Sequence, residues 1–179
     1  MSKKLNVAVV GATGAVGKVM IRILEDRNFP IDNLYLLGCA RAAGTLVEFH
    51  GGSHEVTELD EFDFSDVDLG LFSAGASVSA GFVPKAVEDG VVVVDNTSQF
   101  RRDPEVPLVV PEVNLHALKA HRGIIANPNC STMQMVVALK PIYDAVGIKR
   151  IIVATYQSVS GGGQKAVNEL VAQTNAVLN

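Results

Sequence analysis

The motif NPNCST at residues 127–132 contains the residue best suited to nucleophilic chemistry, a cysteine directly after a polar turn. An apolar helical pattern follows, so we expect Cys130 to lie at or near the start of a helix. The positive end of the helix dipole favours a thiolate there, and a thiolate is a strong nucleophile. Free cysteines are more often buried and structural. Cys39, within an apolar strand pattern, fits that alternative, whereas the polar turn before Cys130 argues against it.

The motif GATGAVG separates an apolar run at residues 5–10 from a helical pattern at residues 15–27. In that context Gly11 permits a tight turn, Gly14 lets the backbone approach a pyrophosphate, and Gly17 lets the helix pack closely on the sheet. The spacing is GxxGxxG and not the commoner GxGxxG. A strand-to-helix turn without a ligand is the alternative, but strand, loop and helix together favour a dinucleotide site.

The end of the second predicted strand indicates which dinucleotide binds. NAD-binding proteins usually place an acidic residue there to hold the ribose hydroxyls. This sequence reads LLGCARAAG at residues 36–44, with no acid and with Arg41. A guanidinium suits a 2′-phosphate, so the sequence favours NADP over NAD. The alternative for Arg41 is a solvated surface arginine.

The elements that position these residues alternate along the chain, which predicts a Rossmann-like, doubly wound parallel α/β sheet. Predicted strands cover residues 5–10, 34–39, 67–73, 91–95, 124–127 and 149–158. Predicted helices cover residues 15–27, 77–89, 130–146 (with Pro141 as a kink or break) and 164–178, and a hairpin covers 46–59. We expect an NADP-binding domain at residues 1–128. Residues 129–179 are expected to begin a second α+β catalytic and dimerisation domain that this chain does not complete.

Composition excludes several classes of protein. The chain has 179 residues, 48% of them hydrophobic and 19% charged, which is typical of a packed globular core. The net charge is −4 with no basic run, so no nucleic-acid partner is expected. Apolar runs are strand-sized, so no membrane span is expected either. Two cysteines do not make a disulfide framework, which favours a cytoplasmic protein, and no metal site is predicted.

Several motifs together resemble the bacterial aspartate-semialdehyde dehydrogenases. They are GATGAVG, FSAG, DNTSQFR, VPLVVPEVN, NPNCST, ALKPIYDAVG and TYQSVSGGG, and the resemblance runs from Asn6 to the last residues. It implies formation of aspartate semialdehyde from β-aspartyl phosphate with NADPH, on the route to lysine, methionine, threonine and diaminopimelate. It further implies a homodimer and a longer full-length protein, of which this chain is the N-terminal portion.

The resemblance also implies roles for individual residues. Cys130 corresponds to the nucleophile that forms an acyl-enzyme, and Gln157 to the residue that orients substrate beside the thiol. Contacts to substrate or phosphate are implied for Arg101, Asn129 and Gln157. Cofactor contacts are implied for Gly11, Thr13, Gly14, Ala15, Val16, Gly17, Arg41, Ala42, Ser73, Ala74, Gly75, Asn96, Ser160 and Gly161.

The sequence departs from the family pattern in one place and leaves two other functions open. Gly162 stands where the family's SGAG motif has alanine. The family's catalytic histidine and cationic substrate ligands lie in a later domain, so we expect the isolated chain to bind NADP without turnover. One alternative is an N-acetyl-glutamyl-phosphate reductase, which uses the same cofactor and thiol chemistry. The other is a non-catalytic NADP-binding module.

Overall fold

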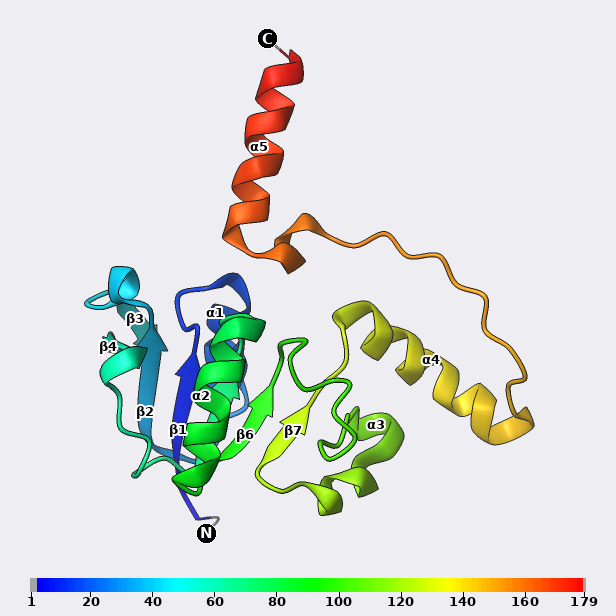
Figure 1. The fold of residues 1–179 in the computed structure, drawn as a ribbon, viewed down its shortest axis with the longest axis horizontal. Coiled ribbons are helices and arrows are strands. Elements are labelled where there is room, and N and C mark those ends of the chain that lie inside the picture. The colour runs from blue at the N-terminus through cyan, green and yellow to red at the C-terminus, as the bar shows by residue number, and fades with distance from the viewer. Residues whose placement is uncertain (1–2, 179) are drawn as a thin grey trace.

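A seven-stranded sheet forms the centre of the protein in a computed structural model, which describes residues 3–178 (Figure 1). The strand order is β3-β4-β2-β1-β5-β6-β7, and every neighbouring pair is parallel except β3 and β4. The strands are β1 (Leu5–Val10), β2 (Ile31–Gly38), β3 (Leu46–Phe49), β4 (Gly52–Glu58), β5 (Leu69–Phe72), β6 (Val92–Asp95) and β7 (Ile124–Ala126).

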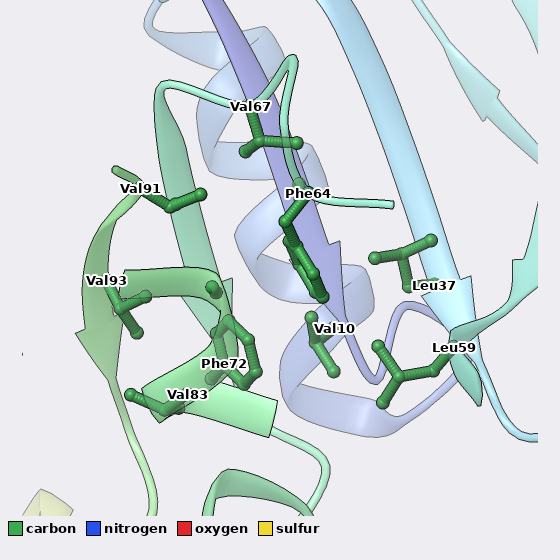
Figure 2. Packing of buried hydrophobic residues seen from close by; sticks show 11 residues of the cluster. Val10, Leu37, Leu59, Phe64, Val67, Phe72, Val83, Val91 and Val93 are labelled. Carbon is green, nitrogen blue, oxygen red and sulfur yellow. The ribbon is translucent and has the colours of Figure 1, made fainter. Parts of the chain in front are cut away.

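Helices α1 and α2 cover opposite faces of this sheet, so the fold is doubly wound. Successive residues of β1 point to opposite sides, and each set belongs to a different buried cluster. The cluster on the α1 (Ala15–Asp26) side includes Val7, Val9, Ile21, Leu24 and Leu36. The cluster on the α2 (Ala76–Glu88) side includes Val10, Leu37, Phe72, Val83 and Val93 (Figure 2). The predicted Rossmann-like class is therefore confirmed.

The remaining helices follow β6 and β7. Between these strands lie α3 (Pro111–Asn114) and the 3-10 helix η3 (Leu115–Ala120). After β7 comes α4 (Cys130–Val146), which begins at the residue the sequence predicted and continues through Pro141 without a break. Two shorter 3-10 turns, η1 (Ala40–Ala42) and η2 (Leu59–Glu61), follow β2 and β4.

The strand predicted at residues 149–158 is wrong for this structure. These residues form no strand, and their side chains are exposed, with Tyr156 at 103% and Ile152 at 89% of full exposure. The β-branched composition favours a strand, but a strand needs a partner, and residues 3–178 offer none for this segment. The 3-10 helix η4 (Val159–Gly162) and α5 (Gln164–Leu178) follow, and Figure 1 shows them standing away from the sheet.

Burial follows the same division. Within residues 3–178, all buried hydrophobic side chains lie between Val7 and Ala126. Helix α5 has no buried residue, and its neighbour in space is η4. No helix in the described part of the chain is both long enough and apolar enough to cross a membrane.

Candidate active site

The glycine loop after β1 is a tight turn against which α1 begins. Gly11 adopts φ +90°, where glycine alone is unstrained, and its carbonyl accepts a hydrogen bond from Gly14 N at 3.0 Å. A Cβ on Gly17 would lie 2.1 Å from Gly11 O, so only glycine fits at this point of the helix. The first turn of α1 has no side-chain cap and no acidic residue. Its N–H groups and the helix dipole therefore suit an anion such as a pyrophosphate.

A second loop, residues 73–75, packs directly against the first. A Cβ on Gly11 would lie 3.0 Å from Ala74 N and 3.1 Å from the carbonyl carbon of Ser73. Ser73 donates from both its backbone N (2.9 Å) and its Oγ (3.2 Å) to Val10 O. The strand order reverses direction between β1 and β5, because β2 lies on one side of β1 and β5 lies on the other. In open α/β sheets, ligands bind at such a reversal, beyond the carboxyl ends of the strands.

Arg41 and Ala42 lie together in η1, immediately after β2. Arg41 is exposed, and no acidic residue occupies η1. This places a cation beside the carboxyl end of the strand next to β1, where a dinucleotide's ribose would lie in this type of fold. The contact of Arg41 with a 2′-phosphate stays a prediction.

The prediction that Cys39 is a buried strand residue is wrong. Strand β2 ends at Gly38, and Cys39 follows it as an exposed residue before η1. The apolar run LYLLGCA contains no sequence signal that distinguishes its last strand residue from the next one. Since both cysteines are exposed, access to solvent does not separate them, and only the helix start distinguishes Cys130.

Arg101 joins the carboxyl ends of β6 and β7. Its Nε donates to Asn127 O and its Nη2 donates to Asn96 O, both at 2.9 Å. Asn127 Nδ2 in turn donates to Asn96 Oδ1 at 2.7 Å. These contacts use two of the five N–H donors of a guanidinium, so the half-buried Arg101 is fixed in place and retains donors for an anion. The sequence interpretation did not include Asn127, and its position directly after β7 was the available signal.

Cys130 is the first residue of α4, as predicted. Asn129 caps the helix, because its Oδ1 accepts a hydrogen bond from Ser131 N at 3.1 Å. The same oxygen lies 3.9 Å from Cys130 Sγ. The cap fixes the turn that follows Asn127. The exposed thiol of Cys130 therefore lies three residues after Asn127, whose carbonyl accepts a hydrogen bond from Arg101.

Most of the predicted site residues therefore follow the carboxyl ends of five neighbouring parallel strands, β2, β1, β5, β6 and β7, but three do not join them. Gln157, Ser160 and Gly161 lie in the exposed segment after α4. Ser160 Oγ lies 2.7 Å from Ser158 Oγ, and Gly161 N donates to Ser158 O at 3.1 Å. Within residues 3–178, no hydrogen bond joins any of these three residues to Cys130. No group of three or more metal-ligating side chains occurs in the same residues.

A Rossmann-like parallel sheet with a glycine loop between β1 and α1 defines a dinucleotide-binding type of fold, and an exposed cysteine begins α4. Residues 6–121 match the family model described as "Semialdehyde dehydrogenase, NAD binding domain". Residues 139–179 match "Semialdehyde dehydrogenase, dimerisation domain". The chain belongs to the semialdehyde dehydrogenase family.

Curated relatives support the same family. An aspartate-semialdehyde dehydrogenase of Legionella pneumophila is 62% identical and matches 100% of this chain and 52% of its own length. One from Bacillus subtilis (strain 168) is 57% identical, again over 100% of this chain and 52% of the relative. The chain thus spans about half the length of the curated relatives it matches.

Solved structures agree with the fold. Aspartate semialdehyde dehydrogenase II of Vibrio cholerae, complexed with ASA, aligns with a TM-score of 0.94 at 56% identity, covering 99% of this chain and 54% of that one. The Candida albicans enzyme with NADP aligns with a TM-score of 0.67 at 28% identity, covering 82% of this chain and 48% of that one.

Proposed function

We propose that this chain provides the cofactor-binding and thiol-bearing half of an enzyme that converts β-aspartyl phosphate to aspartate semialdehyde with NADPH. The exposed Cys130 at the first position of α4, next to the turn that holds Arg101, carries this proposal. The names of the relatives support the substrate, because they are aspartate-semialdehyde dehydrogenases. Such an enzyme would serve lysine, threonine, methionine and diaminopimelate synthesis in the cytoplasm.

The chemistry divides into an acyl transfer and a reduction. The Cys130 thiolate attacks the acyl carbon, the C–O bond to phosphate breaks, and inorganic phosphate leaves with the electron pair. When bound, a nicotinamide cofactor would supply the hydride that reduces the resulting thioester to a thiohemiacetal on Cys130. Collapse of the Cys130 thiohemiacetal then releases the aldehyde and restores the thiol. Covalent attachment keeps the carbonyl in one place for both steps.

Arg101 is proposed to bind the phosphoryl group. Its guanidinium is oriented by two backbone carbonyls, and a planar fork can hold phosphate through two parallel hydrogen bonds. Asn129 and Gln157 are proposed to contact the substrate beside the thiol. For Gln157 this requires that the exposed segment after α4 folds onto the strand edge when the rest of the enzyme is present.

NADP is the proposed cofactor. Thr13, Gly14, Ala15 and Val16 form the turn and first residues of α1, where uncapped N–H groups suit the pyrophosphate. Arg41 and Ala42 would contact the 2′-phosphate. Residues 73–75 and Asn96, at the ends of β5 and β6, would lie at the nicotinamide, together with Ser160 and Gly161. A solved relative with NADP supports this choice of cofactor.

The two-part organisation is proposed as well. Residues 1–128 would form the cofactor domain, and residues 129–179 would open a catalytic domain that pairs two subunits in a homodimer. The match of residues 139–179 to a dimerisation-domain model supports this division. A second domain would also cover the apolar side chains of residues 151–156, which are exposed here.

A chimera tests the proposed activity. Residues 1–179 would replace the aligned part of the Legionella pneumophila relative, which is 62% identical over this whole chain. We expect NADPH formation from aspartate semialdehyde, NADP and phosphate, followed by absorbance. Cys130→Ser should abolish this reaction, because an alcohol is a much weaker nucleophile than a thiolate.

Cys39→Ser is the matched control, since Cys39 is also an exposed free cysteine. It should leave the rate unchanged. A folded chimera that binds NADP but forms no NADPH would refute the proposed function. Retained activity in Cys130→Ser would remove the thioester from the mechanism.

A further inference from the structure

The carboxylate of Asp95 is fully buried at the end of β6, directly before the loop that leads to Arg101. Asp95, the last residue of β6, is 0% exposed and takes part in no salt bridge within residues 3–178. Three donors satisfy its oxygens. Ser79 Oγ and Thr97 N donate to Oδ1 at 2.9 and 3.0 Å, and Thr97 Oγ1 donates to Oδ2 at 2.8 Å. A buried carboxylate without a cation is costly unless it is fully hydrogen-bonded, so these three bonds are needed to hold Asp95 in this position.

Two of these three bonds come from Thr97, which lies on the loop between β6 and Arg101. The Thr97 hydroxyl also accepts a hydrogen bond from Gln99 N at 3.2 Å. The Asp95 carboxylate thus fixes Thr97, and the Thr97 hydroxyl in turn fixes the backbone at Gln99. Asn96, one residue before Thr97, presents the carbonyl that accepts from Arg101 Nη2.

We propose that Asp95 is a positioning residue that orients the Arg101 guanidinium through Thr97. The chain of contacts runs from the carboxylate to the Thr97 backbone and hydroxyl, and from there to the loop that sets the Asn96 carbonyl and the Arg101 side chain. Asp95 itself is fully buried, so its role runs through its neighbours. The inference rests on the proposed function only for the phosphate that Arg101 would bind.

Ser79 provides the comparison that separates positioning from general stability. It donates to the same carboxylate, but it comes from α2 on the other side of Asp95. Removing its hydroxyl costs the carboxylate one bond and leaves both bonds to Thr97 in place. Thr97→Val removes the hydroxyl bond to Oδ2 and the acceptor for Gln99 N, while the side-chain shape is kept.

The test follows the Arg101 Nε–H, which donates to Asn127 O. Its solvent exchange would be measured by NMR on protein labelled with 15N-arginine, with the resonance assigned by its loss in Arg101→Lys. We expect exchange about two- to tenfold faster in Thr97→Val, the factor that one hydrogen bond corresponds to. Thr97→Ser, which keeps the hydroxyl, and Ser79→Ala should match the unmodified protein.

Unchanged exchange in Thr97→Val would overturn the proposal. So would equal acceleration in Ser79→Ala, which indicates general loosening, or in Thr97→Ser, which would show that the hydroxyl is irrelevant. Titration with inorganic phosphate on the same samples separates this from the proposed function. If phosphate does not shift the Arg101 resonance of the unmodified protein, the phosphate role of Arg101 fails, while the exchange data still decide whether Thr97 positions it.

Discussion

Strand β6 and the segment after α4 both contain runs of β-branched residues, but their surroundings are very different. In β6 the valines of VVVD alternate between full and partial burial, whereas Ile151, Ile152 and Val153 are half to nearly fully exposed. Both sequences are β-branched and suited to strands. The difference is the presence of neighbours, because β6 lies between β5 and β7. Strand composition therefore produces a strand only where paired backbone and a covered face are available.

The largest expected effect contrasts one aromatic side chain from each region. Phe72 is fully buried, so Phe72→Ala is expected to destabilise the protein by about 3–5 kcal/mol. Tyr156 is fully exposed, so Tyr156→Ala is expected to change stability by less than about 0.5 kcal/mol. Urea unfolding of both variants measures the contrast. A comparable loss in Tyr156→Ala would show that the segment packs onto the sheet.

A smaller effect is expected from the glycines of the two regions. Gly17→Ala places a Cβ 2.1 Å from Gly11 O, so we expect a loss of about 1–3 kcal/mol and weaker NADP binding. Gly161→Ala meets nothing within 4 Å and should leave the stability unchanged. Gly81→Ala, inside α2 with open space, is the helix control and should stabilise slightly. Thermal unfolding and NADP titration distinguish these outcomes. A Gly17→Ala protein with normal stability would contradict the close packing of α1 on the loop.

The smallest effect concerns pH at the amino end of the sheet, far from the site. The Asn6 backbone N–H, which donates to Asp68 at 2.8 Å, and then Lys3 hold the pKa of Asp68 below its ordinary range. A lowered pKa stabilises the fold above the ordinary Asp value of about 3.9, and this contribution is lost as pH falls through the lowered pKa. The stability advantage over Asp68→Asn should therefore shrink in acid.

Unfolding from pH 7 down to about pH 3 measures this advantage, in the range where the carboxyl titrates. Asp32→Asn, at an exposed position of β2, controls for the change in net charge. An advantage over Asp68→Asn that grows toward low pH would contradict the assigned sign.

Features set by local sequence were predictable. The glycine spacing predicted the turn between β1 and α1, and the polar turn at residues 127–129 predicted that α4 begins at Cys130. Features that depend on distant residues were not. Arg101 is held by carbonyls 5 and 26 residues away, and residues 149–158 lack the partner that a strand requires. Strand β2 ends at Gly38, one residue before the predicted end, and Cys39 is therefore exposed after the strand and not buried within it.

The central claim is that NADP binds at the carboxyl edge of the sheet and that Arg41 contacts its 2′-phosphate. Calorimetric titration of the 179-residue chain with NADP and with NAD tests it most directly. A charge-assisted contact to the 2′-phosphate predicts NADP binding about ten- to a hundredfold tighter than NAD. Arg41→Ala should remove this preference, whereas Arg27→Ala, an equal loss of charge at the far end of α1, should keep it. Equal affinity for both dinucleotides, or a preference that survives in Arg41→Ala, would contradict the account.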